Sequence, residues 1–104
     1  MKLEDDPMFS ALVADGRWAQ LVKALEERAQ TLGDPQRRAD LFEHAMMIYR
    51  DRFANAALAI KAAEGALAAD PDREAAVAYL RDAYQKRRQF DKVAALDARY
   101  PAKR

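Results

Sequence analysis

Cysteine is absent from the 104-residue chain, which contains a single histidine, a single serine and three isolated glycines. Without cysteine there is no disulfide framework, no thiol nucleophile and no thiolate metal site. Ser10 and His44 are not accompanied by a Gly-x-Ser-x-Gly elbow, and neither a glycine-rich phosphate loop nor a His-Glu-x-x-His motif occurs. We therefore predict a protein that is not an enzyme and that binds no metal ion and no cofactor.

Long apolar runs and an excess of one charge are also missing. No hydrophobic stretch approaches the roughly 18 residues of a membrane-spanning helix, and the chain starts with the acidic residues Glu4, Asp5 and Asp6, unlike a signal peptide. The 18 basic and 17 acidic residues give a formal net charge of +1, so bulk charge does not favour nucleic acid as a partner. We expect a cytoplasmic protein without a membrane anchor.

Alanine is the most abundant residue type, whereas β-branched residues are few. This composition predicts an all-α fold. Turn signals stand at Asp6-Pro7, Asp15-Gly16, Gly33-Asp34-Pro35 and Asp70-Pro71-Asp72. The apolar spacing between them predicts helices over 7–14, 17–32, 35–53, 56–69, 73–87 and 90–99. Asp34, Asn55 and Asp72 are the expected N-caps, and the short loops predict antiparallel neighbours.

The chain also repeats itself. The stretch 49–60 aligns without gaps to 84–95, with Tyr49 opposite Tyr84, and the segment that begins at Gly16 corresponds to the one that begins at Ala54 in the middle unit. Trp18 and Phe90 place an aromatic side chain at the same point of two units, where the middle unit has Ala56. Two helices per unit at a period of roughly 35 residues predict a helical solenoid.

These features resemble the tetratricopeptide repeat family. The resemblance rests on the spacing, on Tyr49 and Tyr84 late in the first helix of a pair, and on Trp18 and Phe90 early in the second helix. The family's small residues and its Leu-x-x-Asp-Pro ending are similar to Ala59, Ala66, Leu67, Asp70 and Pro71. The resemblance implies a short right-handed solenoid of antiparallel helical hairpins, about two and a half repeats over 7–100, with tails at 1–6 and 101–104 and with Phe90 in the core.

In this family the first helix of each pair lines a concave groove where partners bind. The resemblance therefore implies a protein-protein interaction or assembly module that binds a peptide or protein segment. Carried over by helix face, the groove residues are Asp40, Glu43, His44, Met47, Asp51, Ala75, Tyr79, Asp82 and Lys86. The carboxylates on this face favour a basic or amphipathic segment. The groove lacks the Lys and Asn pattern that grips a C-terminal carboxylate in chaperone-binding relatives, so we do not expect such peptides as ligands.

Three alternatives remain open from the residues. In the first, the groove face binds no partner and is simply exposed to solvent. In the second, residues 81–104, with eight basic and three acidic side chains, bind RNA through interleaved aromatics; an expected core position for Phe90 makes nucleic acid the less favoured partner. In the third, the last helix mediates homo-oligomerisation, as a homodimer, because no later hairpin covers its apolar side. The self-association residues are Phe90, Val93 and Leu96.

Overall fold

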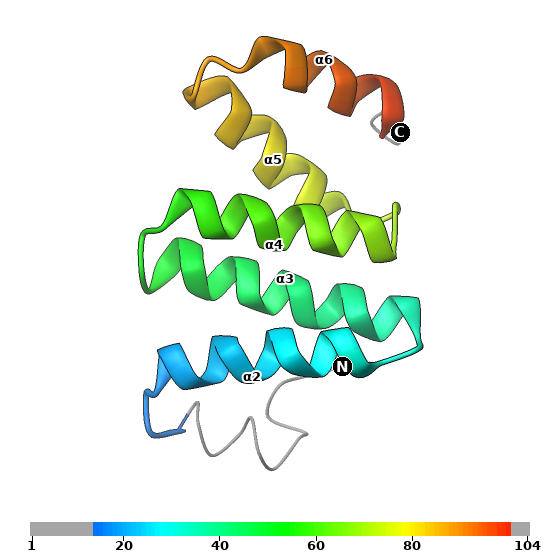
Figure 1. Cartoon of the computed structure of the whole chain (residues 1–104). Helices are drawn as coiled ribbons and strands as arrows, with labels where there is room; N and C mark the ends of the chain where they lie inside the picture. The colour runs from blue at the N-terminus through cyan, green and yellow to red at the C-terminus, as the bar shows by residue number, and fades with distance from the viewer. Residues whose placement is uncertain (1–13, 101–104) are drawn as a thin grey trace.

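Figure 1 shows the computed structural model of the chain, which describes residues 14–100. Within this range the regular elements are all helices, and no strand occurs. The five helices are α2 (Trp18–Thr31), α3 (Pro35–Asp51), α4 (Ala56–Ala69), α5 (Glu74–Lys86) and α6 (Phe90–Arg99). The all-α fold class is confirmed for this range, and each helix lies within two residues of its expected bounds. The helix expected over 7–14, except its last residue, and both tails lie outside the described residues.

Two of the three expected N-caps form. The Asp34 carboxylate accepts the Gln36 N–H at 3.0 Å, and the Asn55 side chain accepts the Leu58 N–H at 3.0 Å. The expectation for Asp72 is wrong, because the N-cap of α5 is the following residue and its side chain makes no capping hydrogen bond. The backbone N–H of Asp72 instead donates to the Asp70 carboxylate at 3.0 Å. This Asx-type turn shifts the start of α5 by one residue.

Successive helices run in alternating directions and are stacked in chain order (Figure 1). The extensive contacts lie between helices that are consecutive in the chain, from α2 with α3 to α5 with α6. The pairing of α3 with α4 is the most extensive and that of α5 with α6 the least. The core is therefore built pairwise along the stack.

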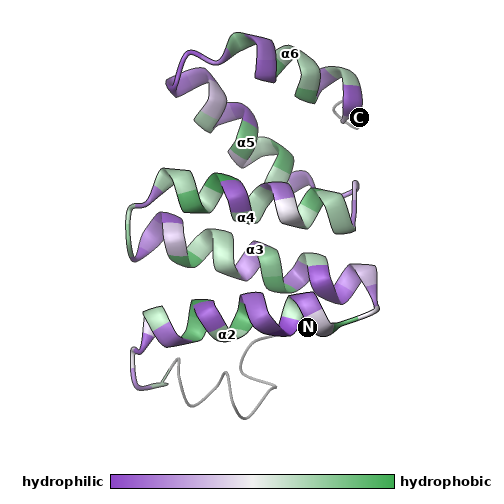
Figure 2. Ribbon diagram, viewed as in Figure 1, coloured by the Kyte–Doolittle hydropathy of each residue, from purple (hydrophilic) through white to green (hydrophobic). Residues whose placement is uncertain are grey.

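Leucine and alanine dominate this core. The largest fully buried side chains are Leu21, Leu25, Leu41, Met46 and Leu80. Helix α4 contributes mainly small buried residues, and hydrophobic and hydrophilic stretches alternate along every helix (Figure 2). A Cβ atom on Gly65 of α4 would lie 3.1 Å from Cδ1 of Phe42 on α3. Small residues on α4 therefore allow the close packing of α3 and α4.

The aligned stretches around Tyr49 and Tyr84 occupy equivalent environments. The Tyr49 hydroxyl on α3 donates to the Glu26 carboxylate on α2, and the Tyr84 hydroxyl on α5 donates to the Glu64 carboxylate on α4 at 3.1 Å. The tyrosines are related by the offset of the gapless alignment, and the glutamates by the offset from the leading unit to the middle unit. Burial and the neighbouring glutamate raise the pKa of each tyrosine to about 12. The same contact thus joins two successive pairs of helices.

The gapless alignment fails beyond the end of the first helix. It pairs Phe90, the first residue of α6, with Asn55, whereas α4 begins at the next residue. The cause is the turn between α3 and α4, which is one residue longer than the turn between α5 and α6. Each turn contains a non-glycine residue in the left-handed region, Ala54 at φ 48° and Arg88 at φ 57°. The positions equivalent to the start of α6 are therefore one residue later in the middle unit than the gapless alignment gives.

Candidate functional site

A hollow of about 500 Å³ lies between the end of α3, the start of α4 and one face of α5. Its α5 residues recur every three or four positions, so they share one side of the helix. The lining residues, which we call the α5 groove, are Arg50, Ala56, Ala75, Ala78, Tyr79, Asp82, Ala83, Lys86 and Arg87. Four of them are alanines, so the hollow exists because this part of the surface has short side chains.

The lining of the α5 groove contains three basic residues and one acidic residue, a net charge of +2. Asp82 forms an ion pair with Lys86 one helical turn later, with 3.0 Å between Oδ2 and Nζ. Arg50 donates two hydrogen bonds to Asp51, at 2.8 and 3.0 Å, and these raise the Arg50 pKa and lower the Asp51 pKa. Among residues 14–100 no carboxylate pairs with Arg87. These contacts are exposed, and such pairs are weak in water.

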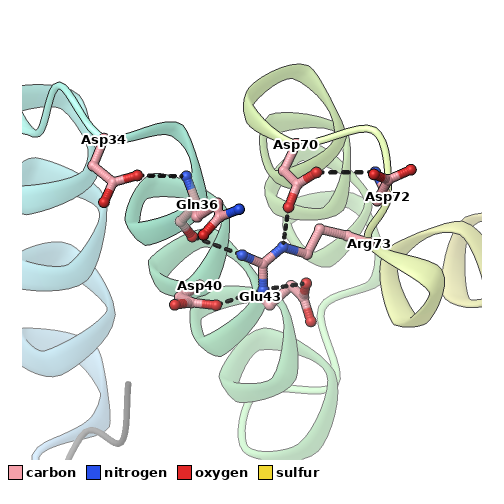
Figure 3. Close-up of polar contacts among 7 residues, drawn as sticks. All are labelled: Asp34, Gln36, Asp40, Glu43, Asp70, Asp72 and Arg73. Carbon is pink, nitrogen blue, oxygen red and sulfur yellow. Dashed lines mark hydrogen bonds and ion pairs between the residues drawn. The ribbon is translucent and has the colours of Figure 1, made fainter.

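A second polar assembly, the Arg73 cluster, joins α3 to the turn between α4 and α5 (Figure 3). Arg73 Nε donates to Asp70 Oδ2 at 2.9 Å, Nη1 donates to Asp40 Oδ1, and Nη2 donates to the Gln36 carbonyl oxygen at 2.8 Å. Glu43 Oε1 lies 3.5 Å from Arg73 Nη1. The planar guanidinium therefore bridges two elements that are far apart in the chain.

The Arg73 cluster is largely shielded from water. The Arg73 side chain is 21% exposed and the Glu43 side chain 15%. Burial raises the Glu43 pKa, and the nearby Asp40 adds to this, although Arg73 acts in the opposite direction. Burial opposes the charge on Arg73, but the hydrogen bonds to Asp40 and Asp70 outweigh it and raise the Arg73 pKa. The carboxylates of this cluster are therefore engaged within the molecule.

The structure places most of the expected groove residues in these two sites and the rest outside both. Asp40 and Glu43 belong to the Arg73 cluster. The expected residues that line the α5 groove are Ala75, Tyr79, Asp82 and Lys86. The remaining expected residues lie on α3 outside the hollow: His44 is half-buried, Met47 is exposed, and Asp51 is exposed beside Arg50.

Sequence reasoning assigned neither Arg50 nor Arg73 to a site, and it included Arg87 only in the basic stretch 81–104. No periodic signal marks Arg73, because its α3 partners lie 33 and 37 residues away and it follows a turn rather than a helix face. Arg50 and Arg87 stand at the ends of the first helices of two units. A search for basic residues at those helix ends would have found both.

The expectation that Phe90 is a core residue is wrong, because its side chain is 63% exposed. The equivalent Trp18 is covered by Arg52 from the turn between α3 and α4, whose guanidinium lies 4.3 Å from the centre of the indole ring. No later segment within the described range covers Phe90 in this way. Val93 is half-buried and Leu96 is buried against the core, so only Phe90 of the three expected self-association residues is open to solvent.

Within residues 14–100 no group of three or more His, Asp or Glu side chains is arranged to hold a metal ion. No helix in that range combines the length and apolar character needed to cross a bilayer. Comparison with protein-family models, with curated proteins and with solved structures gave no match to this chain.

Proposed function

We propose that this protein is a non-enzymatic interaction module of the tetratricopeptide-like class, and that it binds a segment of another protein in the α5 groove. The single observation that carries this proposal is the groove itself. The short alanine side chains of its lining leave room for a partner backbone or helix to approach closely, and Tyr79 adds a partly exposed aromatic side chain to this lining.

The repeat architecture supports this proposal. The equivalent contacts of Tyr49 with Glu26 and of Tyr84 with Glu64 favour a stack of similar hairpins in which each unit contacts its neighbours. A stack of this kind presents a preformed surface, which lowers the entropic cost of binding. The chain would thus act by holding α3, α4 and α5 in fixed register around the groove.

The chemistry of the groove favours binding over catalysis. Arg50, Asp82 and Lys86 belong to exposed ion pairs and Arg87 is exposed, whereas the tyrosines with pKa values of about 12 donate to glutamates between helices outside the groove. A catalytic acid or base needs a perturbed group positioned in a cleft. The described groove offers an aromatic anchor and an ionic rim instead.

The test is affinity capture with two matched tryptophan variants. Ala78→Trp fills the groove, whereas Ala19→Trp adds the same bulk at an exposed alanine on α2 outside it. We expect a specific partner to be retained by the wild type and Ala19→Trp, and lost from Ala78→Trp and Tyr79→Ala. Capture that is the same for all four proteins would refute binding in this groove.

A homo-oligomerisation unit is the alternative that one observation favours, namely the 63% exposure of Phe90 on the last described helix. A dimer built on this helix should dissociate in Phe90→Ala. Sedimentation would show a mass near twice 11.8 kDa for the wild type and near 11.8 kDa for the variant. A wild-type mass of one chain at all concentrations would exclude this alternative.

A further inference from the structure

Two of the four carboxylates that the helix face offers to a basic partner are already held within the molecule. Asp40 and Glu43 are held by Arg73, which also hydrogen bonds to Asp70 and to the Gln36 carbonyl. A basic segment would have to displace a guanidinium that is four-fifths buried. Removing one member of a part-buried charge network leaves the remaining charges poorly compensated. This end of the surface is therefore unfavourable for binding a cation.

The basic residues at the other end are available. The Arg50 side chain is 45% exposed and the Lys86 side chain 76% exposed. Their intramolecular partners, Asp51 and Asp82, are neighbours on the same helix and are also open to water. Exposed pairs of this type contribute little and exchange readily. An incoming carboxylate can therefore replace or share these contacts at low cost.

The cations of the α5 groove come from two different helices, and four alanines share the lining with them. Arg50 comes from the end of α3, and Lys86 and Arg87 come from the end of α5. The turns that follow these two helices lie at the same edge of the molecule (Figure 1). Basic side chains concentrated around a concave surface attract anions and orient them as they approach.

We propose that the segment bound in the α5 groove is acidic. Its Asp or Glu side chains pair with Arg50, Lys86 and Arg87, while its apolar side covers Tyr79 and the alanine side chains of the lining. This inference rests on the proposed function and specifies its partner. It reverses the partner charge predicted by counting carboxylates on the helix face. A guanidinium can receive a carboxylate through two parallel hydrogen bonds, so Arg50 and Arg87 supply direction as well as charge.

The experiment is a selection from a random-peptide library displayed on phage, with the full chain immobilised. The groove variant is Arg50→Glu with Lys86→Glu. The matched control is Lys23→Glu with Lys61→Glu, which makes the same change in net charge at exposed positions on α2 and α4 outside the groove. Circular dichroism establishes that each variant is folded before selection.

We expect the wild type and the matched control to enrich peptides rich in Asp and Glu. Affinity for a selected acidic peptide should fall at least about tenfold in the groove variant, and should weaken as salt is added. Enrichment of basic or uncharged peptides whose binding is lost in Ala78→Trp would overturn the acidic partner while leaving the proposed function intact. Absence of any enrichment over Ala78→Trp would overturn both.

Discussion

At one end of the surface between α3 and α5, Arg73 draws the carboxylates of α3 and of the following turn into a shielded network. At the other end, Arg50 and Lys86 pair with neighbours on their own helices and remain exposed. Both ends are rich in charge, yet only at the second are the paired side chains open to solvent. The pairing of charged side chains, rather than their number on a helix face, therefore decides which of them are accessible.

Arg73→Ala tests the shielded end most directly. The substitution removes three hydrogen bonds and leaves Asp40, Glu43 and Asp70 close together without their shared cation. We expect the free energy of unfolding to fall by about 2 kcal/mol, because the network is partly buried. Urea unfolding measures the change, and Arg73→Lys should recover only part of it, since lysine keeps the charge but lacks the planar fork. An unchanged urea midpoint would mean that the Arg73 cluster contributes no more to stability than the exposed ion pairs do.

The tyrosine contacts provide an internal standard for a part-buried polar contact. Tyr49→Phe and Tyr84→Phe should each lower the free energy of unfolding by about 1 kcal/mol at neutral pH, with similar values for equivalent positions. Because the folded-state pKa of each tyrosine is about 12, above the usual 10, the contribution is complete below pH 10 and is lost as pH rises through 12. Urea midpoints at neutral and alkaline pH measure it. Very different losses at the two positions would contradict their equivalence.

The two ends should also differ in how stability depends on pH. The Glu43 pKa is raised, so the ionised carboxylate is disfavoured in the folded state, and its contribution to stability declines as pH rises from its ordinary value of 4.5 through the raised value. The free energy of unfolding of Glu43→Gln, relative to that of the wild type, should therefore be higher at pH 7 than at pH 4. For Asp51, whose pKa is lowered, the contribution is instead lost as pH falls. The free energies of unfolding of the wild type, Glu43→Gln and Asp51→Asn, measured as a function of pH, check both signs. Variant curves that run parallel to the wild-type curve would contradict them.

Stability should change least at the groove end. Arg50→Glu with Lys86→Glu should change the free energy of unfolding by no more than about 0.5 kcal/mol, because the native ion pairs are exposed. The same variant should lose most of its affinity for an acidic peptide. Thermal or urea unfolding beside the peptide titration separates the two quantities. A loss of stability as large as that of Arg73→Ala would remove the contrast between the two ends.

Local signals in the sequence were sufficient for the helices and for part of the groove. Asp34 and Asn55 cap as expected because a cap depends on residues within one helical turn. Tyr79, Asp82 and Lys86 lie together because helical periodicity puts them on one side of α5. These predictions needed no knowledge of how helices pack.

The failures concern contacts between elements and the turns that join them. Asp72 was misassigned because the Asp70 side chain forms the preceding turn, and Arg73 was missed because its partners include another helix. Phe90 was expected in the core because it is equivalent to Trp18. Arg52 covers Trp18, however, whereas Phe90 is 63% exposed. A repeat pattern predicts which positions are equivalent, while burial depends on what lies next to each unit.

The unequal pairing of helices has a mechanical consequence for the groove. Its α3 and α4 walls belong to the most tightly joined pair, where Gly65 lies against Phe42. Helix α5 forms the opposite wall, is joined less extensively to α4 and α6, and is tethered near its first residue by Arg73. The tether joins the start of α5 to α3 itself, so the two walls of the groove are held together there by one side chain rather than by an extensive helix interface.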